Sequence, residues 1–296
     1  MTDAETPVSP APILVTGAVG NIGCEVVSRL LDRGQKVRAA DIDPAAVRSV
    51  FSDRVEAVRF DFTDAATWPV TFHGIEVMFL MRPPQLSSIA RDMVPALEAA
   101  KAAGIRHVVL LSLQGAEGNK IVPHAKIEAW LRSSGLAWTF VRPSFFMEKL
   151  TGTHVSDIRD RDELMVPAGK GATSFVAASA IAGVSVVALL DPTAHAMRAW
   201  TPTGPQALTY EQVAADLSRV LGRPIRYRRP GIPRYAWHAK RTLGMPLAMV
   251  GVTTAIYTVS RLGRAAGLTE DVQTVTGHEP VAFADWAQEN RDAWLR

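Results

Sequence analysis

Cysteine is almost absent from the sequence, since Cys24 is the only one among 296 residues. A single cysteine forms no internal disulfide, so we expect a protein of the reducing cytoplasm. The seven histidines show neither HxH nor HExxH spacing and have no cysteine pair beside them. This pattern argues against a zinc site, and we expect no bound metal.

Long apolar runs are also lacking. The longest, at 184–190 and 246–257, are shorter than the roughly 20 residues that span a bilayer. The N-terminal segment, Met1–Pro7, is polar and acidic and has no apolar stretch of the kind found in a signal peptide. We therefore expect a soluble protein that does not bind a membrane.

No charge of one sign dominates. The 32 basic and 29 acidic residues leave a net charge of +3, which does not by itself argue for a nucleic-acid partner. Hydrophobic residues make up 48% of the chain and charged residues 21%, as in ordinary globular enzymes. The length fits one large domain or two small ones.

Short β-branched runs alternate with amphipathic segments over the first 142 residues. The runs predict strands at 12–16, 36–42, 55–60, 76–81, 106–112 and 137–142. The intervening segments predict helices at 20–31, 45–51, 87–103 and 123–134. This alternation is typical of an α/β fold of Rossmann type, with a doubly wound parallel sheet and helices on both faces.

A glycine-rich loop, GAVGNIG at 17–23, follows the first predicted strand and begins the first helix. Glycine allows a tight turn and lets backbone N–H groups approach a pyrophosphate, to which the helix start adds its positive dipole end. Because the loop lies inside a βαβ unit, it predicts dinucleotide binding, with an ordinary tight turn as the alternative. The predicted cofactor-binding residues here are Gly17, Val19, Gly20, Asn21, Ile22 and Gly23.

Asp41 ends the second predicted strand, 18 residues after Gly23. A carboxylate there can accept hydrogen bonds from the adenosine ribose and repels a 2′-phosphate, so it favours NADH over NADPH. The alternative is a turn and helix cap at 41–44. Arg38 is expected on the opposite face of the strand.

The pattern changes after Ser144. A strand at 175–178 and a helix at 180–190 are expected to return to the sheet, and a further helix is expected at 209–221. We expect an NAD(P)-binding domain at 1–150, completed by 172–192. The segments 151–171 and 193–296 would then form a smaller α+β lid that binds the substrate.

Seven segments together resemble the NmrA-like branch of the atypical short-chain dehydrogenases/reductases, over nearly the whole chain. They read LVTGAVGNIG (14–23), DFTD (61–64), VMFLMRPP (77–84), VLLSLQGA (109–116), HAKIEAWL (124–131), TFVRPSFFME (139–148) and TGPQALTY (203–210). The branch contains quinone reductases, ketone and alkene reductases, and cofactor-sensing regulators that catalyse no reaction.

The resemblance implies roles for further residues at or beyond the carboxyl ends of predicted strands. For the cofactor it implies Asp61, Phe62, Leu80, Met81, Arg82, Lys126 and Phe145. For catalysis it implies Ser112 and Lys126, and for the substrate Gln114, Phe146 and Met147. Structural alternatives are a turn for Asp61, a strand-end cap for Ser112, a solvated helix residue for Lys126, and core packing for Phe145 and Phe146.

The chain departs from the superfamily's Tyr-x-x-x-Lys arrangement, because Val122 stands where the tyrosine would fall. The usual tyrosine–lysine proton relay is therefore missing. His124 is a candidate donor, with a surface or capping role as the alternative. We favour a proton supplied by the substrate or by water. Ile42 also differs, since NADP-preferring relatives often place an arginine there.

These features predict an NAD(P)H-dependent reductase of a ketone or quinone, with a bulky polycyclic aromatic ketone of secondary metabolism as one candidate. A cofactor-sensing regulator without catalysis is the alternative, and an isomerase is a weaker one. The expected partner is a small molecule, and the protein is expected to be a monomer or homodimer.

Five arginines, at 223, 226, 228, 229 and 234, lie among aromatic residues in the last third of the chain. At strand period, Arg226 and Arg228 share one face while Ile225 and Tyr227 share the other. This arrangement favours an edge strand, or the wall of a pocket for a large, flat or anionic ligand, over a nucleic-acid surface.

Overall fold

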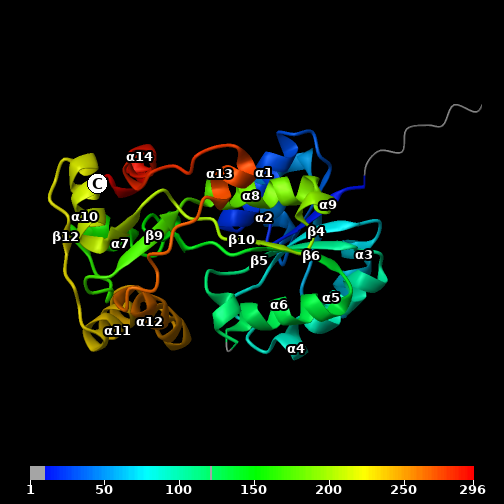
Figure 1. The fold of residues 1–296 in the computed structure, drawn as a ribbon, viewed down its shortest axis with the longest axis horizontal. Coiled ribbons are helices and arrows are strands. Elements are labelled where there is room, and N and C mark those ends of the chain that lie inside the picture. Colours follow the sequence, from blue (N-terminus) through cyan, green and yellow to red (C-terminus); the bar gives the residue numbers. More distant parts are fainter. Residues whose placement is uncertain (1–10, 121) are drawn as a thin grey trace, which may run out of the picture. The chain divides into compact units, whose positions relative to one another are not determined.

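A computed structural model describes residues 11–120 and 122–296, which form two compact units (Figure 1). The first unit contains the described residues up to Arg142 together with Ala182–Trp200. The second contains Pro143–Ile181 and Thr201–Arg296. The first unit has one large sheet and the second has two small ones, and each unit has its own core.

The first unit is built on a seven-stranded parallel sheet in the order β10-β6-β5-β4-β1-β2-β3. Its strands are β1 (Ile13–Thr16), β2 (Val37–Asp41), β3 (Glu56–Arg59), β4 (Val77–Met81), β5 (His107–Leu111), β6 (Ala137–Val141) and β10 (Arg198–Trp200). The six strands predicted up to residue 142 are confirmed to within one residue at each end. The predicted doubly wound α/β class is also confirmed.

Helices cover both faces of this sheet, as Figure 1 shows for α1 on one side and α5 and α6 on the other. They are α1 (Asn21–Leu31), α2 (Pro44–Phe51), α3 (Trp68–Phe72), α4 (Ile89–Asp92), α5 (Val94–Ala102), α6 (Pro123–Ser134), the end of α8 (Ala178–Leu190) and α9 (Pro192–His195). Side chains on one face of the sheet and its helices form a continuous apolar core, which includes Leu14, Leu80, Ile127 and Phe140.

The single helix predicted at 87–103 is wrong. The chain forms two helices instead, α4 and α5, separated at Met93, whose backbone (φ −123°, ψ −38°) is not α-helical. Pro95 lies in the first turn of α5. Because proline lacks an N–H and its ring crowds the preceding turn, a helix begins there more readily than it continues through.

The expectation that 175–178 returns to the main sheet is also wrong. The strand at this point, β9 (Ala172–Val176), pairs with β7 (Phe145–Phe146) and β11 (Ala207–Thr209) in the second unit. Both of its edges are therefore occupied there. The main sheet gains β10 instead, which pairs in parallel with β6.

The second unit combines small sheets with helices. Besides β7, β9 and β11 it contains β8 (Glu163–Leu164), β12 (Arg226–Tyr227), the start of α8, α7 (Val155–Arg161), α10 (Tyr210–Leu221), α11 (Ile232–Arg241), α12 (Leu247–Arg261), α13 (Asp271–Thr276) and α14 (Phe283–Glu289). Its core is rich in aromatic rings, among them Phe175, Tyr210, Tyr235 and Trp294. No helix in the described part of the chain is both long and apolar enough for a membrane span.

A buried histidine lies inside the main sheet. His107 in β5 is 3% exposed, and its Nε2 lies 2.9 Å from Oγ1 of Thr139 in β6. Burial, with a smaller effect from the charge of His195, lowers the pKa of His107 to about 4.

This histidine should make stability sensitive to acid. Below about pH 6.5 the unfolded chain binds a proton that the native state binds only near pH 4, so the free energy of unfolding falls as the pH drops through this range. We expect His107→Gln to flatten this dependence by up to about 3 kcal/mol, measured by urea unfolding at several pH values. The exposed His73→Gln is the control and should keep the wild-type slope. An unchanged slope in His107→Gln would contradict the prediction.

Candidate nucleotide-binding and active site

The glycine loop between β1 and α1 turns back tightly on itself. Gly17 has φ +65°, a left-handed conformation that favours glycine, and the Gly20 N–H donates to the Gly17 carbonyl at 3.0 Å. A Cβ at Gly23 would lie only 2.0 Å from that carbonyl oxygen. Glycine is therefore required at 17 by the left-handed backbone and at 23 by the close contact with the Gly17 carbonyl.

The N-terminus of α1 is open to an anion. Its N-cap, Gly20, supplies no side-chain hydrogen bond, and the first turn holds no acidic residue. The N–H groups of this turn are thus not capped by a side chain and are available to a phosphate. The Ile22 side chain is buried in the core, so a contact from Ile22 to a ligand would come from its main chain. The loop accordingly fits the pyrophosphate of a dinucleotide.

Thr16 joins the loop to the neighbouring strand, a role that sequence reasoning missed. Its Oγ1 donates to the Phe79 carbonyl at 3.1 Å and accepts from the Met81 N–H at 2.9 Å, which ties the end of β1 to the end of β4. The Met81 side chain then covers Gly17, where a Cβ would lie 2.0 Å from Met81 Cε. The only feature of the sequence that indicates this role is a threonine hydroxyl at the end of a buried strand.

Asp41 lies at the end of β2, beside the loop. Its carboxylate accepts from the Ile42 N–H at 2.8 Å and more weakly from the Val19 N–H at 3.4 Å. Arg38 bonds elsewhere, to Glu56 and to the His73 carbonyl. The carboxylate is therefore held at the loop without pairing to this arginine.

Asp61 adopts the turn role that was named as its alternative, and Phe62 packs in the core. Asp61 Oδ1 accepts from the N–H and the hydroxyl of Thr63, which forms a turn. Phe62 is buried and packs edge-on against Phe60, with ring centroids 4.6 Å apart. Leu80 is likewise fully buried in the core. Contacts of these three residues with a cofactor stay a prediction.

A buried ion pair lies behind Ser112, at the carboxyl ends of β5 and β6. The Ser112 hydroxyl donates to Glu128 Oε1 at 2.6 Å, and Arg142 donates to both oxygens of Glu128, at 2.9 and 2.6 Å. All three side chains are less than a tenth exposed. Because Ser112 has a single hydroxyl proton, which this bond occupies, it faces any ligand as an acceptor. Sequence reasoning missed Glu128 and Arg142.

His124, at the start of α6, is largely buried beside Arg82. Burial, and next the charge of Arg82, lower the pKa of His124 to about 4, so the imidazole is neutral at neutral pH. Arg82 donates to the carbonyls of Pro83 and Leu86, and burial lowers its pKa. A neutral His124 can form hydrogen bonds but is a weak proton donor.

The remaining predicted residues fall in different places. In the first unit, Lys126 is exposed on α6 and Gln114 is half-buried after β5. Phe145, Phe146 and Met147 belong to the second unit, where Met147 is 1% exposed within the apolar core. Phe145 is half-buried and lies 5.6 Å from the ring of Phe175. The structure thus groups the glycine loop, Asp41, Met81 and Ser112 along the carboxyl edge of one sheet.

Comparison with known proteins agrees with this architecture. A model of the NmrA-like family matches residues 10–281. An NAD(P)H azoreductase from Xenophilus azovorans is 33% identical over 95% of this chain and 99% of its own. A Streptomyces griseus protein named (4-alkanoyl-5-oxo-2,5-dihydrofuran-3-yl)methyl phosphate reductase is 32% identical over 95% and 99%. Among solved structures, Citrobacter sp. triphenylmethane reductase complexed with NADP(H) superposes with a TM-score of 0.81 at 20% identity, covering 94% and 99%.

The backbone contact at Gly23 generates a test of the loop. A methyl group there would overlap the Gly17 carbonyl, so we expect Gly23→Ala to displace the loop and weaken NADH binding by at least about tenfold, measured by fluorescence titration. Gly118→Ala is the matched control, because a Cβ there has no heavy atom within 4 Å. Equal affinities in the two variants would show that the loop does not bind the nucleotide.

Proposed function

Since the chain belongs to the NmrA-like family, we propose that it is an NAD(P)H-dependent reductase that transfers a hydride to a ketone or quinone. Two relatives of about one-third identity over nearly the full chain are named as reductases, which supports an oxidoreductase. The uncapped start of α1 and the close-packed glycine loop support binding of the nucleotide.

The residues have distinct proposed tasks. The loop at 17–23 and the first turn of α1 would hold the pyrophosphate, and Asp41 would accept hydrogen bonds from the adenosine ribose. When bound, the reduced nicotinamide supplies the hydride. The protein's own contribution is to bind and orient the acceptor at the carboxyl edge of the sheet.

The observation that carries the proposal is the state of the candidate proton donors in the first unit. Ser112 already donates its hydroxyl proton to Glu128, and His124, with a pKa of about 4, is neutral at neutral pH. Val122 takes the place of the usual tyrosine. A proton from the substrate or from water therefore completes the reaction. This suits a quinone, or a ketone conjugated to a polycyclic aromatic system, because the reduced oxygen's charge is delocalised until it is protonated.

Isotope transfer tests this function. The purified chain should oxidise NADH or NADPH with quinones or polycyclic aromatic ketones, using cofactor deuterated at the transferred position. Deuterium on a product carbon would identify a ketone reductase, and cofactor oxidation without carbon-bound deuterium would identify quinone reduction. Tight cofactor binding without turnover of any acceptor would overturn the proposal and favour a cofactor-sensing regulator.

His124→Gln provides a second measurement on the same reaction. We expect its turnover to stay within about tenfold of wild type, since loss of a general acid typically costs about 10²–10⁴-fold. A loss in that larger range, with an inflection missing from the pH profile of the variant, would show that His124 donates the proton.

We further propose that NADH is the preferred cofactor. The Asp41 carboxylate at the end of β2 would repel a 2′-phosphate, and the exposed Ile42 offers no positive charge to it. Asp41→Asn should raise the ratio of kcat/KM for NADPH to that for NADH by about tenfold or more. Asp53→Asn makes the same charge change at an exposed position of the first unit that is not part of the loop, and it should leave this ratio unchanged. An Asp41 variant with wild-type preference would contradict the assignment.

A further inference from the structure

A surface pocket of about 210 Å³ in the second unit is lined mainly by charged side chains. Its lining residues are Arg161, Asp162, Pro224, Arg226 and Arg228. We propose that this pocket binds a phosphate dianion, either free or as a small phosphate monoester. The proposal rests on the second unit alone and does not depend on the reductase function.

Strand pairing places two of the arginines at the pocket. The Arg226 N–H donates to the Asp162 carbonyl at 2.9 Å, and the Arg228 N–H donates to the Leu164 carbonyl at 3.1 Å. Arg226 and Arg228 are two residues apart and exposed, while Ile225 is buried. The buried Ile225 therefore anchors the segment 225–228 and leaves both arginines on its solvated side, as the alternation in the sequence predicts.

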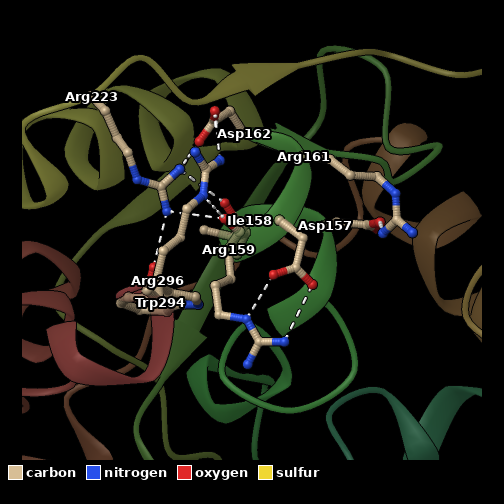
Figure 2. Close-up of polar contacts among 9 residues, drawn as sticks. Asp157, Ile158, Arg159, Arg161, Asp162, Arg223, Trp294 and Arg296 are labelled. Atoms are coloured by element: carbon tan, nitrogen blue, oxygen red, sulfur yellow. Dashed lines mark hydrogen bonds and ion pairs between the residues drawn. The ribbon is translucent and has the colours of Figure 1, made fainter.

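The one acidic side chain in the pocket wall is already neutralised. Asp162 follows α7 with φ +58°, and its carboxylate forms ion pairs with Arg223 and Arg296 (Figure 2). The Arg296 Nη2–Asp162 Oδ2 distance is 2.8 Å. Arg223 also donates to the carbonyls of Ile158 and Trp294, which fixes its guanidinium beside the aspartate. Asp162 thus places little uncompensated negative charge in the pocket.

Of the three arginines that line the pocket, two form ion pairs with acidic side chains in the described part of the chain and one does not. Arg161 pairs with the buried Asp157 at 3.1 Å, and Arg228 pairs with Glu163. Arg226 has no acidic partner among residues 11–120 and 122–296. Its guanidinium is the positive charge most available to a ligand.

The charge balance around the pocket favours a dianion. The lining holds three guanidinium groups and one carboxylate, so the positive side chains exceed the negative ones by two. The ion-pair partners of these residues leave the difference unchanged, because the side chains of Arg223 and Arg296 add two positive charges and those of Asp157 and Glu163 add two negative ones. A phosphate monoester carries about −1.5 to −2 charges near pH 7, and guanidinium groups bind it through paired N–H donors. A carboxylate would neutralise only half of this excess.

Calorimetric titration of the full chain tests the proposal, with phenyl phosphate and inorganic phosphate as probes. NADH is present at saturation, because the glycine loop is itself expected to bind phosphate. We expect one site per chain, with an affinity that rises from about pH 5.5 to about pH 7.5 as the phosphate loses its second proton. Tighter binding of phenyl phosphate would identify an organic monoester as the ligand. Equal or tighter binding of inorganic phosphate would identify the free ion.

Arg226→Gln is the decisive variant, because removing this arginine leaves no acidic residue unpaired. We expect it to weaken phosphate binding by about tenfold or more. Arg234→Gln removes the same charge from an exposed position on α11 and should stay within about twofold of wild type. The proposal would be overturned by the absence of saturable binding, by an unaffected Arg226→Gln, or by equal losses in both variants.

Discussion

The candidate site depends on the close approach of the backbone at Gly23 to the Gly17 carbonyl. No side chain fits between them, so α1 begins after a tight turn of only four residues, 17–20, and its first turn lies at the carboxyl edge of the sheet. Thr16 reinforces this arrangement by bonding the end of β1 to β4, which brings Met81 over Gly17. Asp41 reaches the same loop from the next strand. Groups from three adjacent strands thus meet at the tight glycine loop.

Much of the first unit is predictable because its signals are local. Each strand up to residue 142 is a short apolar run, and α6 has the bounds expected from Pro123 at its start and Gly135 after its end. The errors arise where local pattern does not decide the structure. The sequence 87–103 is amphipathic throughout, yet Pro95 starts a second helix within it. The apolar segment 172–176 suits either sheet, and its partners β7 and β11 lie far from it in the sequence.

The site shows the same division. The glycine loop and Asp41 are recognised from spacing alone, whereas the Ser112–Glu128–Arg142 cluster is not. Glu128 lies on a helix that looks solvated at neighbouring positions such as Lys126, and only the rotation of α6 against the sheet turns it inward. Its partner Arg142 directly follows a buried strand, where a charged residue needs a counter-charge. That signal indicates a buried pair but does not identify the partner.

This cluster also bears on the chemistry of the first unit. Removing one member of a buried, bidentate pair leaves the other charge desolvated and without its partner. The loss of either Glu128 or Arg142 alone would therefore lower the free energy of unfolding. As long as the pair is intact, Glu128 accepts three hydrogen bonds, and its oxygens hold the Ser112 proton away from any ligand. The Ser112 hydroxyl, at the end of β5, is therefore not available to donate a hydrogen bond to a ligand. The proposed reduction is therefore easiest for an acceptor that can hold negative charge on oxygen until water or the substrate supplies the proton, which is a property of quinones and aryl-conjugated ketones rather than of simple aliphatic ketones.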